Sequence, residues 1–336
     1  MPLGYALRCA PQGETMRRYL TQRLLAVIPT LLGVTLIVFI AIRLVPGDAI
    51  TSMLGTEAGM LTETQRAALE KYFGLDKPAA QQYFTWLGNV LRGNLGYSVR
   101  QGKPVLTLIL ERFPVTLELA LVSLVIALVV GISIGILSAS LHNSSIDLAG
   151  RLFSLIGLAA PNFLVGTLLI YVLSVYFGTL PNAGNYVELT RDPVQNFRQI
   201  IFPALTLGLA FSASVMRTTR SAMLEVLGED YIRTAKSKGL RELTVIMRHA
   251  LPNALIPVVT LAGVELGYLL GGAVIVERIF SLPGLGRLTL NAISQRDYAL
   301  IQGATLFIAM NFVAINLVVD LIYATIDPRI SYATKK

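Results

Sequence analysis

Six long apolar runs are the feature that most constrains this chain. They cover residues 24–45, 114–140, 152–177, 200–224, 253–276 and 301–326. A helix needs about 20 apolar residues to cross the hydrocarbon of a bilayer, and it satisfies its own backbone hydrogen bonds there. Only 14% of the residues are charged, whereas an average soluble domain carries roughly 25%. The sequence therefore predicts an all-α polytopic membrane protein with six transmembrane helices.

Basic residues in the short connections predict the orientation of these spans. The two termini and the connections on their side carry 15 Lys and Arg residues, namely Arg8, Arg17, Arg18, Arg23, Arg151, Arg217, Arg220, Arg233, Lys236, Lys238, Arg241, Arg248, Arg329, Lys335 and Lys336. The short connections on the opposite side carry five, namely Arg191, Arg198, Arg278, Arg287 and Arg296. Cytoplasmic connections are the ones enriched in Lys and Arg. We therefore expect both termini in the cytoplasm.

This orientation divides the chain into five parts. They are a cytoplasmic tail over 1–23, a first transmembrane helix over 24–45, an extracytoplasmic region over 46–112, a five-helix core over 113–326 and a cytoplasmic tail over 327–336. The first apolar run is longer than the roughly 7–15 residues of a signal-peptide core. We expect it to be an uncleaved anchor.

The extracytoplasmic region has helical patterns of its own. "TETQ" at Thr62–Gln65 is typical of a capping box, and the helix that it opens is expected to end at Gly74. Tyr83 and Leu87, with Val90 or Leu91, follow at helical spacing. We expect a helical insertion, and both a lid over a pore mouth and an interfacial element without a role of its own remain open.

Small residues and prolines predict how the spans pack. Gly131 and Gly135 in "GISIG", like the Gly271–Gly272 pair, let helices approach closely, either inside the subunit or against a partner. Pro161 and Pro257 lie inside predicted spans, and each is expected to kink its helix.

The chain contains none of the common catalytic motifs. It has no G-x-x-x-x-G-K-[ST] phosphate loop, no G-x-S-x-G elbow and no H-E-x-x-H pair. One cysteine and two histidines exclude an internal disulfide and make a metal cluster untenable. The net charge of +8 follows from basic residues beside apolar runs, which indicates membrane orientation and not nucleic-acid binding. We expect no catalytic site, metal or cofactor in this chain.

Four ionisable residues lie in or near the ends of the predicted spans: Arg43, Glu118, Glu265 and Asp320. Such groups are costly in lipid and commonly mark a pathway or a partner. Glu265, in "GVELG", is the deepest of them, and it either lines a translocation cavity or bonds to a neighbouring helix as a neutral acid. Glu265 and Asn162 are the two candidate pathway residues.

The connection "YIRTAKSKGLREL", residues 231–243, is more organised than a charge patch requires. Apolar residues recur at a period near 3.6, and they are Ile232, Ala235, Gly239 or Leu240, Leu243, and Ile246 or Met247. Gly239 is expected to divide the segment into two short helices joined by a bend. The apolar stripe packs either within the subunit or in the groove of another subunit. The pattern alone does not choose between the two.

The same stretch resembles a family signature. In E-A-A-x3-G-x9-I-x-L-P, the signature of binding-protein-dependent ABC importer permeases, Ala235, Gly239, Leu251 and Pro252 stand at matching positions. Arg233, Thr234 and His249 replace the Glu, the first Ala and the Ile, as is usual in the dipeptide and oligopeptide permeases that "RTTRSAMLEVLGEDYIRTAKSKGL" resembles.

The resemblance runs over nearly the whole chain from Met16. Further motifs are "PGD" at 46–48, "FGLDKP" at 73–78, "GNLGYS" at 93–98, "RFPVTLELA" at 112–120, "LPNAG" at 180–184, "LLGGAVIVERIFSLPGLGRL" at 269–288 and "RDYALIQG" at 296–303. Each is weak alone, but their order and spacing together are specific. Asn94 and Ala299 stand where Asp and Pro are commoner in the family.

The resemblance implies a type I ABC importer permease fold in a bacterial inner membrane. It also implies a second, related permease subunit, two ATPase subunits that bind ATP and Mg, an extracytoplasmic binding protein and a peptide substrate. The loop 228–252 would contact the ATPases, and the residues that it implies for this contact are Tyr231, Ile232, Arg233, Thr234, Ala235, Lys236, Ser237, Lys238, Gly239, Leu240, Leu251 and Pro252. Within that loop, residues 231–238 would form the coupling helix.

Other functions remain open at this stage. Permeases for nickel, glutathione, opines or oligosaccharides look alike at this level. Outside the family, a self-sufficient secondary transporter or channel would transport without ATPase partners, and a membrane scaffold or receptor would transport nothing.

Overall fold

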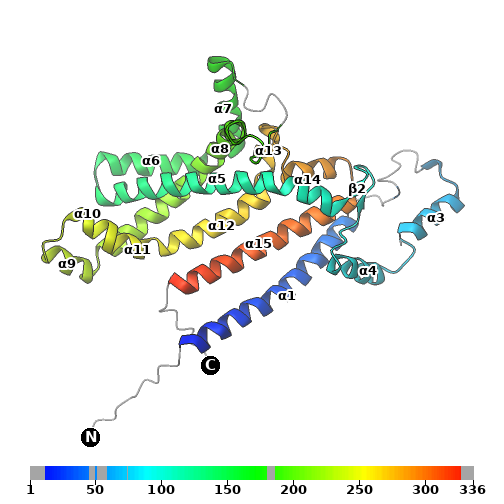
Figure 1. Cartoon of the computed structure of the whole chain (residues 1–336), viewed down its shortest axis with the longest axis horizontal. Coiled ribbons are helices and arrows are strands. Elements are labelled where there is room, and N and C mark those ends of the chain that lie inside the picture. Colours follow the sequence, from blue (N-terminus) through cyan, green and yellow to red (C-terminus); the bar gives the residue numbers. More distant parts are fainter. Residues whose placement is uncertain (1–11, 45–49, 51–58, 74, 180–185, 327–336) are drawn as a thin grey trace, which may run out of the picture.

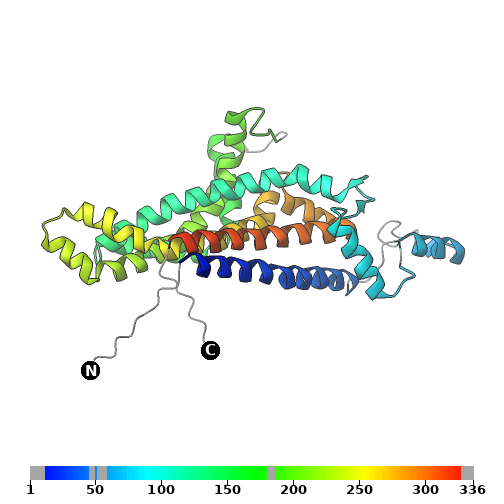
Figure 2. The same cartoon turned by 60° about the horizontal axis from the view of Figure 1, so that its bottom comes forward.

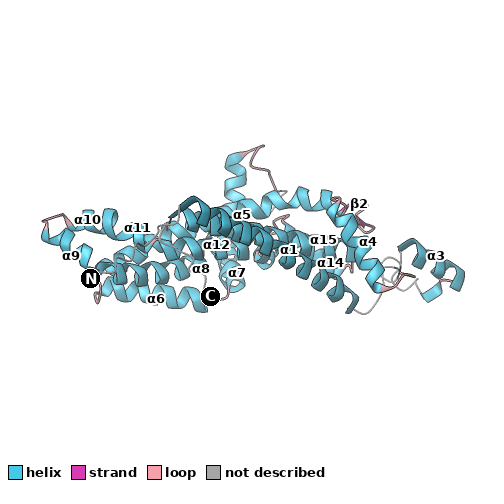
Figure 3. Ribbon diagram, turned by 90° about the horizontal axis from the view of Figure 1, so that it is seen from below, coloured by secondary structure: helices cyan, strands magenta, loops and turns pink. Residues whose placement is uncertain are grey.

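The computed structural model describes residues 12–44, 50, 59–73, 75–179 and 186–326. Four helices are long and apolar enough to cross a membrane: α1 (Gln12–Leu44), α5 (Val105–Ser140), α8 (Pro193–Leu227) and α15 (Tyr298–Ile326). Two bent pairs raise the number to six if each pair is one span. Figure 3 shows that the regular structure of the described residues is helical apart from one short hairpin, β1 (Tyr97–Ser98) with β2 (Lys103–Pro104).

The long helices lie side by side along the longest dimension of the molecule (Figure 1). One end holds the start of α1, the end of α15 and the short helices α9 (Asp230–Ser237) and α10 (Glu242–Thr244), and Figure 2 shows the same grouping. The other end holds α3 (Glu63–Phe73), α4 (Ala79–Leu91), the hairpin and α14 (Leu285–Ser294). The first and last described residues thus lie at the same end, as an even number of spans requires.

Glycines bring α5, α6 and α8 into backbone contact. A Cβ atom at Gly131 or Gly135 of α5 would lie 2.6 Å from the Cβ of Val215 or of Thr219 on α8. On α6 (Ser145–Ala159), a Cβ atom at Gly157 would lie 2.6 Å from the Cβ of Ala213, again on α8. The predicted seam at "GISIG" is confirmed, and it packs inside the subunit. We refer to α5, α6 and α8 as the three-helix body.

The third predicted span is two helices and not one kinked helix. Helix α6 ends at Ala159 and α7 runs over Asn162–Phe177, and the two meet at 101°. Ala160 is extended, because a residue before proline avoids the helical region, and Pro161 caps α7. Helix α7 leaves the bundle sideways (Figures 1 and 2). A proline predicts such a break, but the packing on either side decides its angle.

The second bent pair contains the predicted kink at Pro257. It joins α10, the π-helix η2 (Val245–Ala250) and α11 (Leu251–Ala254) to α12 (Ile256–Gly272), with a bend of 52°. Two further short elements follow, α13 (Val274–Ile279) and then α14. Helix α12 lies against α15 through Gly267 and Gly271, where a Cβ atom would meet Phe312 and Ile308.

The region between the first two predicted spans contains helices, as predicted. Thr62 and Gln65 bond reciprocally, with Thr62 N to Gln65 Oε1 at 2.9 Å and Gln65 N to Thr62 Oγ1 at 3.3 Å, which confirms the capping box. Helix α3 ends at Phe73, and Gly74 lies outside the described residues. Helix α5 begins at Val105, ahead of the predicted span at 114–140, and its 36 residues extend about 54 Å, well beyond the ~30 Å hydrocarbon core. The hairpin was not predicted.

Candidate functional site

The loop after α8 forms the short helix α9. Glu229 and Asp230 stand at its start and Lys236 in its last turn, where they complement the helix dipole. Gly239 follows with φ of 76°, and a Cβ atom there would meet nothing within 4 Å. Backbone conformation therefore favours glycine at this bend, and lack of space does not.

Two of the predicted contact residues face inward. Ile232 is fully buried and Ala235 is 7% exposed. They are surrounded by apolar residues of the same subunit, which are Ala139, Met223, Val245, Ile246, Ala250 and Ala254; we call these six residues the α9 socket. The apolar stripe thus divides, because Leu240, Leu243 and Met247 are exposed. Of the two alternatives that the pattern left open, packing within the subunit holds for Ile232 and Ala235.

The outer face of α9 is basic and polar. Arg233, Thr234, Lys236, Ser237 and Lys238 are all exposed. Within the helix, Arg233 Nη1 lies 3.0 Å from Asp230 Oδ1, and the Thr234 and Ser237 hydroxyls donate to backbone carbonyls one turn earlier. These charges and Leu243 form the surface that a partner could contact.

Tyr231 joins α9 to the segment before α12. Its hydroxyl accepts a hydrogen bond from Asn253 Nδ2 at 2.8 Å and donates to the His249 carbonyl at 3.4 Å. Leu251 packs against the cluster around Ile232, whereas Pro252 is exposed. The structure therefore gathers Tyr231, Leu251 and the α9 residues around one junction at the end of α8.

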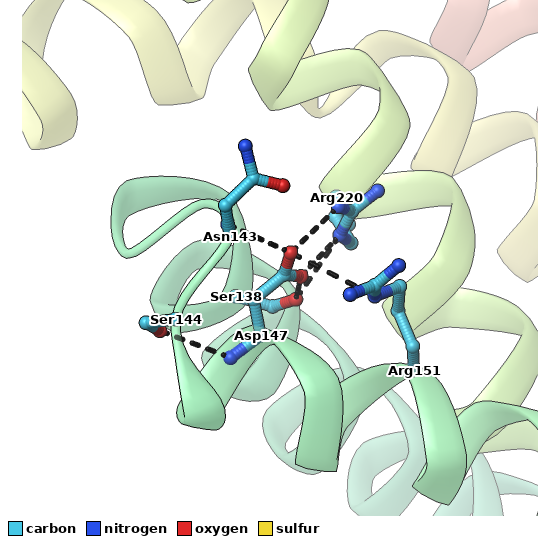
Figure 4. Close-up of polar contacts among 6 residues, drawn as sticks. All are labelled: Ser138, Asn143, Ser144, Asp147, Arg151 and Arg220. Atoms are coloured by element: carbon cyan, nitrogen blue, oxygen red, sulfur yellow. Dashed lines mark hydrogen bonds and ion pairs between the residues drawn. The ribbon is translucent and has the colours of Figure 1, made fainter.

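A buried acid–base network lies beside this junction and was not predicted (Figure 4). Asp147 of α6 has no exposed surface. Arg220 of α8 donates to it twice, Nε to Oδ1 at 2.7 Å and Nη2 to Oδ2 at 2.9 Å. Ser138 Oγ donates to Oδ1 at 2.6 Å, and the Asn143 amide donates to Oδ2 at 3.1 Å. We call these four residues the Asp147 network.

The sequence carries only a faint signal of this network. Ser144 caps α6 by accepting from the Asp147 amide at 3.2 Å, and "SSID" is a recognisable helix start. The sequence identifies Arg220, however, only as one of the basic residues near the end of the fourth span that predict membrane orientation. Nothing local to Asp147 indicates a partner 73 residues away.

A second buried carboxylate, Glu277, holds the start of α14. Thr116 of α5 donates to its Oε1 at 2.6 Å, and the backbone amide of Arg287 donates to Oε2 at 2.8 Å. The Thr116 hydroxyl also accepts from the amide of Leu285 at 2.8 Å. Both side chains are essentially buried, so they tie α5, α13 and α14 together away from solvent.

The ionisable residues near the span ends have partners. Arg43 of α1 bonds to Gln82 of α4 and lies over the ring of Phe39. Glu118 accepts from the hydroxyl of Tyr186 at 2.8 Å. Burial and the adjacent Glu118 raise the pKa of Tyr186, so the phenol stays protonated and remains the donor.

The two candidate pathway residues are not brought together. Glu265 is partly buried on α12, and Asn162 is the first residue of α7 and also partly buried. No hydrogen bond joins either side chain to another residue in the part of the chain that the structure describes. The side chain of Asp320 lies outside the described set.

Comparison with known proteins covers almost the entire chain. Residues 131–332 match the family described as binding-protein-dependent transport system inner membrane component. Residues 16–120 match the N-terminal part described for membrane components of such systems.

Individual relatives match over nearly their full length. The oligopeptide transport system permease protein AppB of Bacillus subtilis is 44% identical over 94% of this chain and 100% of its own. The glutathione transport system permease protein GsiC of Pectobacterium atrosepticum is 42% identical over the same shares. Among solved structures, a chain of the MetNI methionine ABC transporter in an inward-facing conformation matches 66% of this chain and 96% of its own, with a TM-score of 0.52 and 17% identity. That last likeness concerns the fold alone.

Proposed function

Because the chain belongs to the family of binding-protein-dependent transport system inner membrane components, we propose that it forms the translocation pathway of an ATP-driven importer for di- and oligopeptides. The observation that carries the substrate class is the full-length match to an oligopeptide permease and to a glutathione permease. Glutathione is itself a small peptide, so both relatives handle one kind of chemistry. Nickel, opines and oligosaccharides are the competing substrates within the family.

The energy for transport comes from partner subunits in this proposal. The chain carries no phosphate-loop motif, so two ATPase subunits bind ATP and Mg, and a second related permease completes the pathway. An extracytoplasmic binding protein delivers the peptide. The 15 basic residues on the side of the termini support a cytoplasmic location for that end of the molecule.

The contact with the ATPases is the exposed face of α9 and the bend that follows it. Tyr231, Arg233, Lys236, Lys238 and Leu240 are all exposed there, and their charges suit an acidic or polar groove. Ile232 and Ala235 support the helix from below. A short helix rooted in this way passes on a rigid-body movement, since packed elements shift as units and do not deform gradually. Gly239 sets the direction in which the chain leaves this helix.

The pathway itself contains Glu265 and Asn162. A carboxylate in the middle of a span is costly when it faces lipid. This cost supports surroundings for Glu265 that are either filled with water or covered by a partner. Pathway and helix-contact roles for Glu265 are separated by measuring peptide uptake after Glu265→Gln, which retains bulk and removes charge.

Reconstitution of the complete complex in lipid vesicles tests the function. Labelled di- and oligopeptides should accumulate only with ATP, the ATPase subunits and the binding protein present. Vesicles that contain this chain alone serve as the control, and peptide transport by them would show a self-sufficient transporter instead. Import of nickel, opines or oligosaccharides but not peptides would replace the substrate and leave the architecture in place. A chain that supports no flux under any of these conditions would be a scaffold.

A further inference from the structure

We propose that Asp147 and Arg220 are a positioning pair that fastens the turn between α5 and α6 to the end of α8, so that α9 and the three-helix body move as one unit. This inference rests on the proposed function, because it assigns the pair a place in transmitting movement from the ATPases. It adds a residue pair that lies outside the contact surface itself.

The geometry of the network makes it a rigid connection. Both carboxylate oxygens of Asp147 are used twice, with Arg220 bonding to each, Ser138 to Oδ1 and the Asn143 amide to Oδ2. Paired donors from a planar guanidinium fix orientation as well as distance. Arg151, 3.7 Å away and half exposed, is only peripheral. Three segments, the end of α5, the start of α6 and the last turns of α8, are therefore held at one point.

The network and the α9 socket share the same helix ends. Ser138 directly precedes Ala139 of the socket on α5, and Arg220 lies one turn before Met223 of the socket on α8. Ile232 of α9 is fully buried in the same apolar cluster, to which those helix ends contribute Ala139 and Met223. A displacement of α9 thus presses on the two helices that the Asp147 network joins.

Glycine packing continues the connection along the three helices. Beyond the network, Gly131, Gly135, Gly157 and Gly208 place backbone against side chain across the three-helix body, with no long side chain between them. On α6, a Cβ atom at Gly150 would lie 3.3 Å from Ser138, so close packing reaches the network itself. Helices packed this tightly slide poorly and transmit a push as a rigid body.

An ion pair serves this purpose in a way that apolar packing would not. A buried ion pair is often no more stable than well-packed apolar side chains of the same volume, but its bonds are directional. At the end of the bundle, where the chain turns and water is near, an apolar contact would allow the α5–α6 turn to rotate over α8. The pair prevents that rotation.

A distance measurement tests the rigid unit directly. The full complex is prepared with Cys9, the single native cysteine, replaced by serine. Spin labels are attached at Asp230→Cys on α9, which lies outside the residues assigned to the ATPase contact, and at Ile146→Cys on α6, both exposed. The label-to-label distance should stay the same between nucleotide-free and ATP-trapped complexes, and it should change between these states in Asp147→Asn. A distance that changes in the otherwise native background would overturn the proposal.

Coupling is the functional readout. In Asp147→Asn we expect assembly with the ATPases and basal ATP hydrolysis to be retained, while ATP consumed per peptide imported rises by about fivefold, within the range that mutations between coupled sites produce. Arg220→Lys, which keeps the charge but loses the paired donors, should show a smaller rise. Removing the exposed Lys103–Glu111 pair at the other end of the molecule (Lys103→Gln with Glu111→Gln), whose side chains are 51% and 41% exposed, is the matched control and should change nothing.

The results that would contradict this proposal differ from the result that would contradict the proposed function. Unchanged ATP consumption per peptide in both Asp147→Asn and Arg220→Lys would defeat the positioning role. The proposal would also fail if both variants lost import only in proportion to the amount of assembled complex that they lost. The pair would then act in folding alone. Failure of the unsubstituted complex to import peptides would instead remove the proposed function.

Discussion

The carboxylate of Glu277 fills the space that a side chain at Gly284 would need. Gly284 is the residue before α14, and any Cβ atom there would overlap all three carboxylate atoms of Glu277. The carboxylate of Glu277 can reach Thr116 and the amide of Arg287 only because Gly284 has no side chain. The hydrogen bonds of Glu277 between α13 and α14 therefore depend on the absence of a side chain at Gly284.

Gly284→Ala should destabilise the protein. The methyl group displaces Glu277 from its donors, and unpaired buried polar groups cost about 1–3 kcal/mol each. Thermal unfolding of the purified complex should show a lower Tm. Gly88→Ala in α4, where a Cβ atom meets nothing within 4 Å, is the control and should leave the Tm unchanged or slightly raised. Equal behaviour of the two variants would mean that Glu277 moves aside without cost.

Thr116→Val should also destabilise the protein, although it changes the size of the side chain very little. The substitution keeps the shape of the side chain but leaves Glu277 Oε1 and the Leu285 amide without this partner, for a cost of about 1–3 kcal/mol. Thr167→Val in α7 is the matched control, since that hydroxyl is exposed and bonds only to Phe163 one turn earlier. The two Tm values decide the matter, and no difference between them would contradict the account of α14.

Substitutions at Gly239 should separate backbone conformation from bulk. Asparagine adopts positive φ more readily than other residues, whereas a β-branched residue at φ of 76° is strained by at least about 1–2 kcal/mol. Gly239→Asn should therefore retain peptide uptake and co-purification of the ATPases, and Gly239→Val should lose much of both. Similar uptake in the two variants would show that the bend does not need this conformation.

Substitutions of the buried and of the exposed residues of α9 should have different effects on stability and on ATPase association. Ile232→Ala removes a fully buried side chain and should lower the Tm of the isolated subunit, at a cost of about 2–5 kcal/mol. Lys236→Gln with Lys238→Gln should leave that Tm unchanged but weaken ATPase association, with less dependence on salt than the native surface shows. Pull-down at two salt concentrations and unfolding of the subunit measure both effects. Intact association in the double variant would place the contact elsewhere.

Much of the fold could be predicted, since it follows from local patterns. Apolar length indicated the spans, reciprocal side chains at Thr62 and Gln65 indicated the start of α3, and small residues at Gly131 and Gly135 indicated a close helix contact. The resemblance to ABC importer permeases is confirmed by the family match over residues 131–332. These features depend on residues that are close together in the sequence.

Features that depend on distant partners could not be predicted. The 3.6-residue period of α9 shows that Ile232 shares a face with Ala235, but it cannot say whether that face meets its own subunit or another. The 101° angle at Pro161 depends on what α6 and α7 pack against. Strands of two residues each, as in the hairpin, are too short to show alternation. The role of residues 231–252 in contacting a partner stays a prediction.

During translation, Asp147 is added to the chain 73 residues ahead of Arg220. At the ~5–20 residues per second of protein synthesis, the carboxylate waits about 4–15 s for its partner. An unpaired carboxylate is costly inside hydrocarbon, so the turn between α5 and α6 must remain at the water surface while α7 and the first part of α8 are made. Final seating of α6 is thus a late event in biogenesis, timed by the arrival of one arginine.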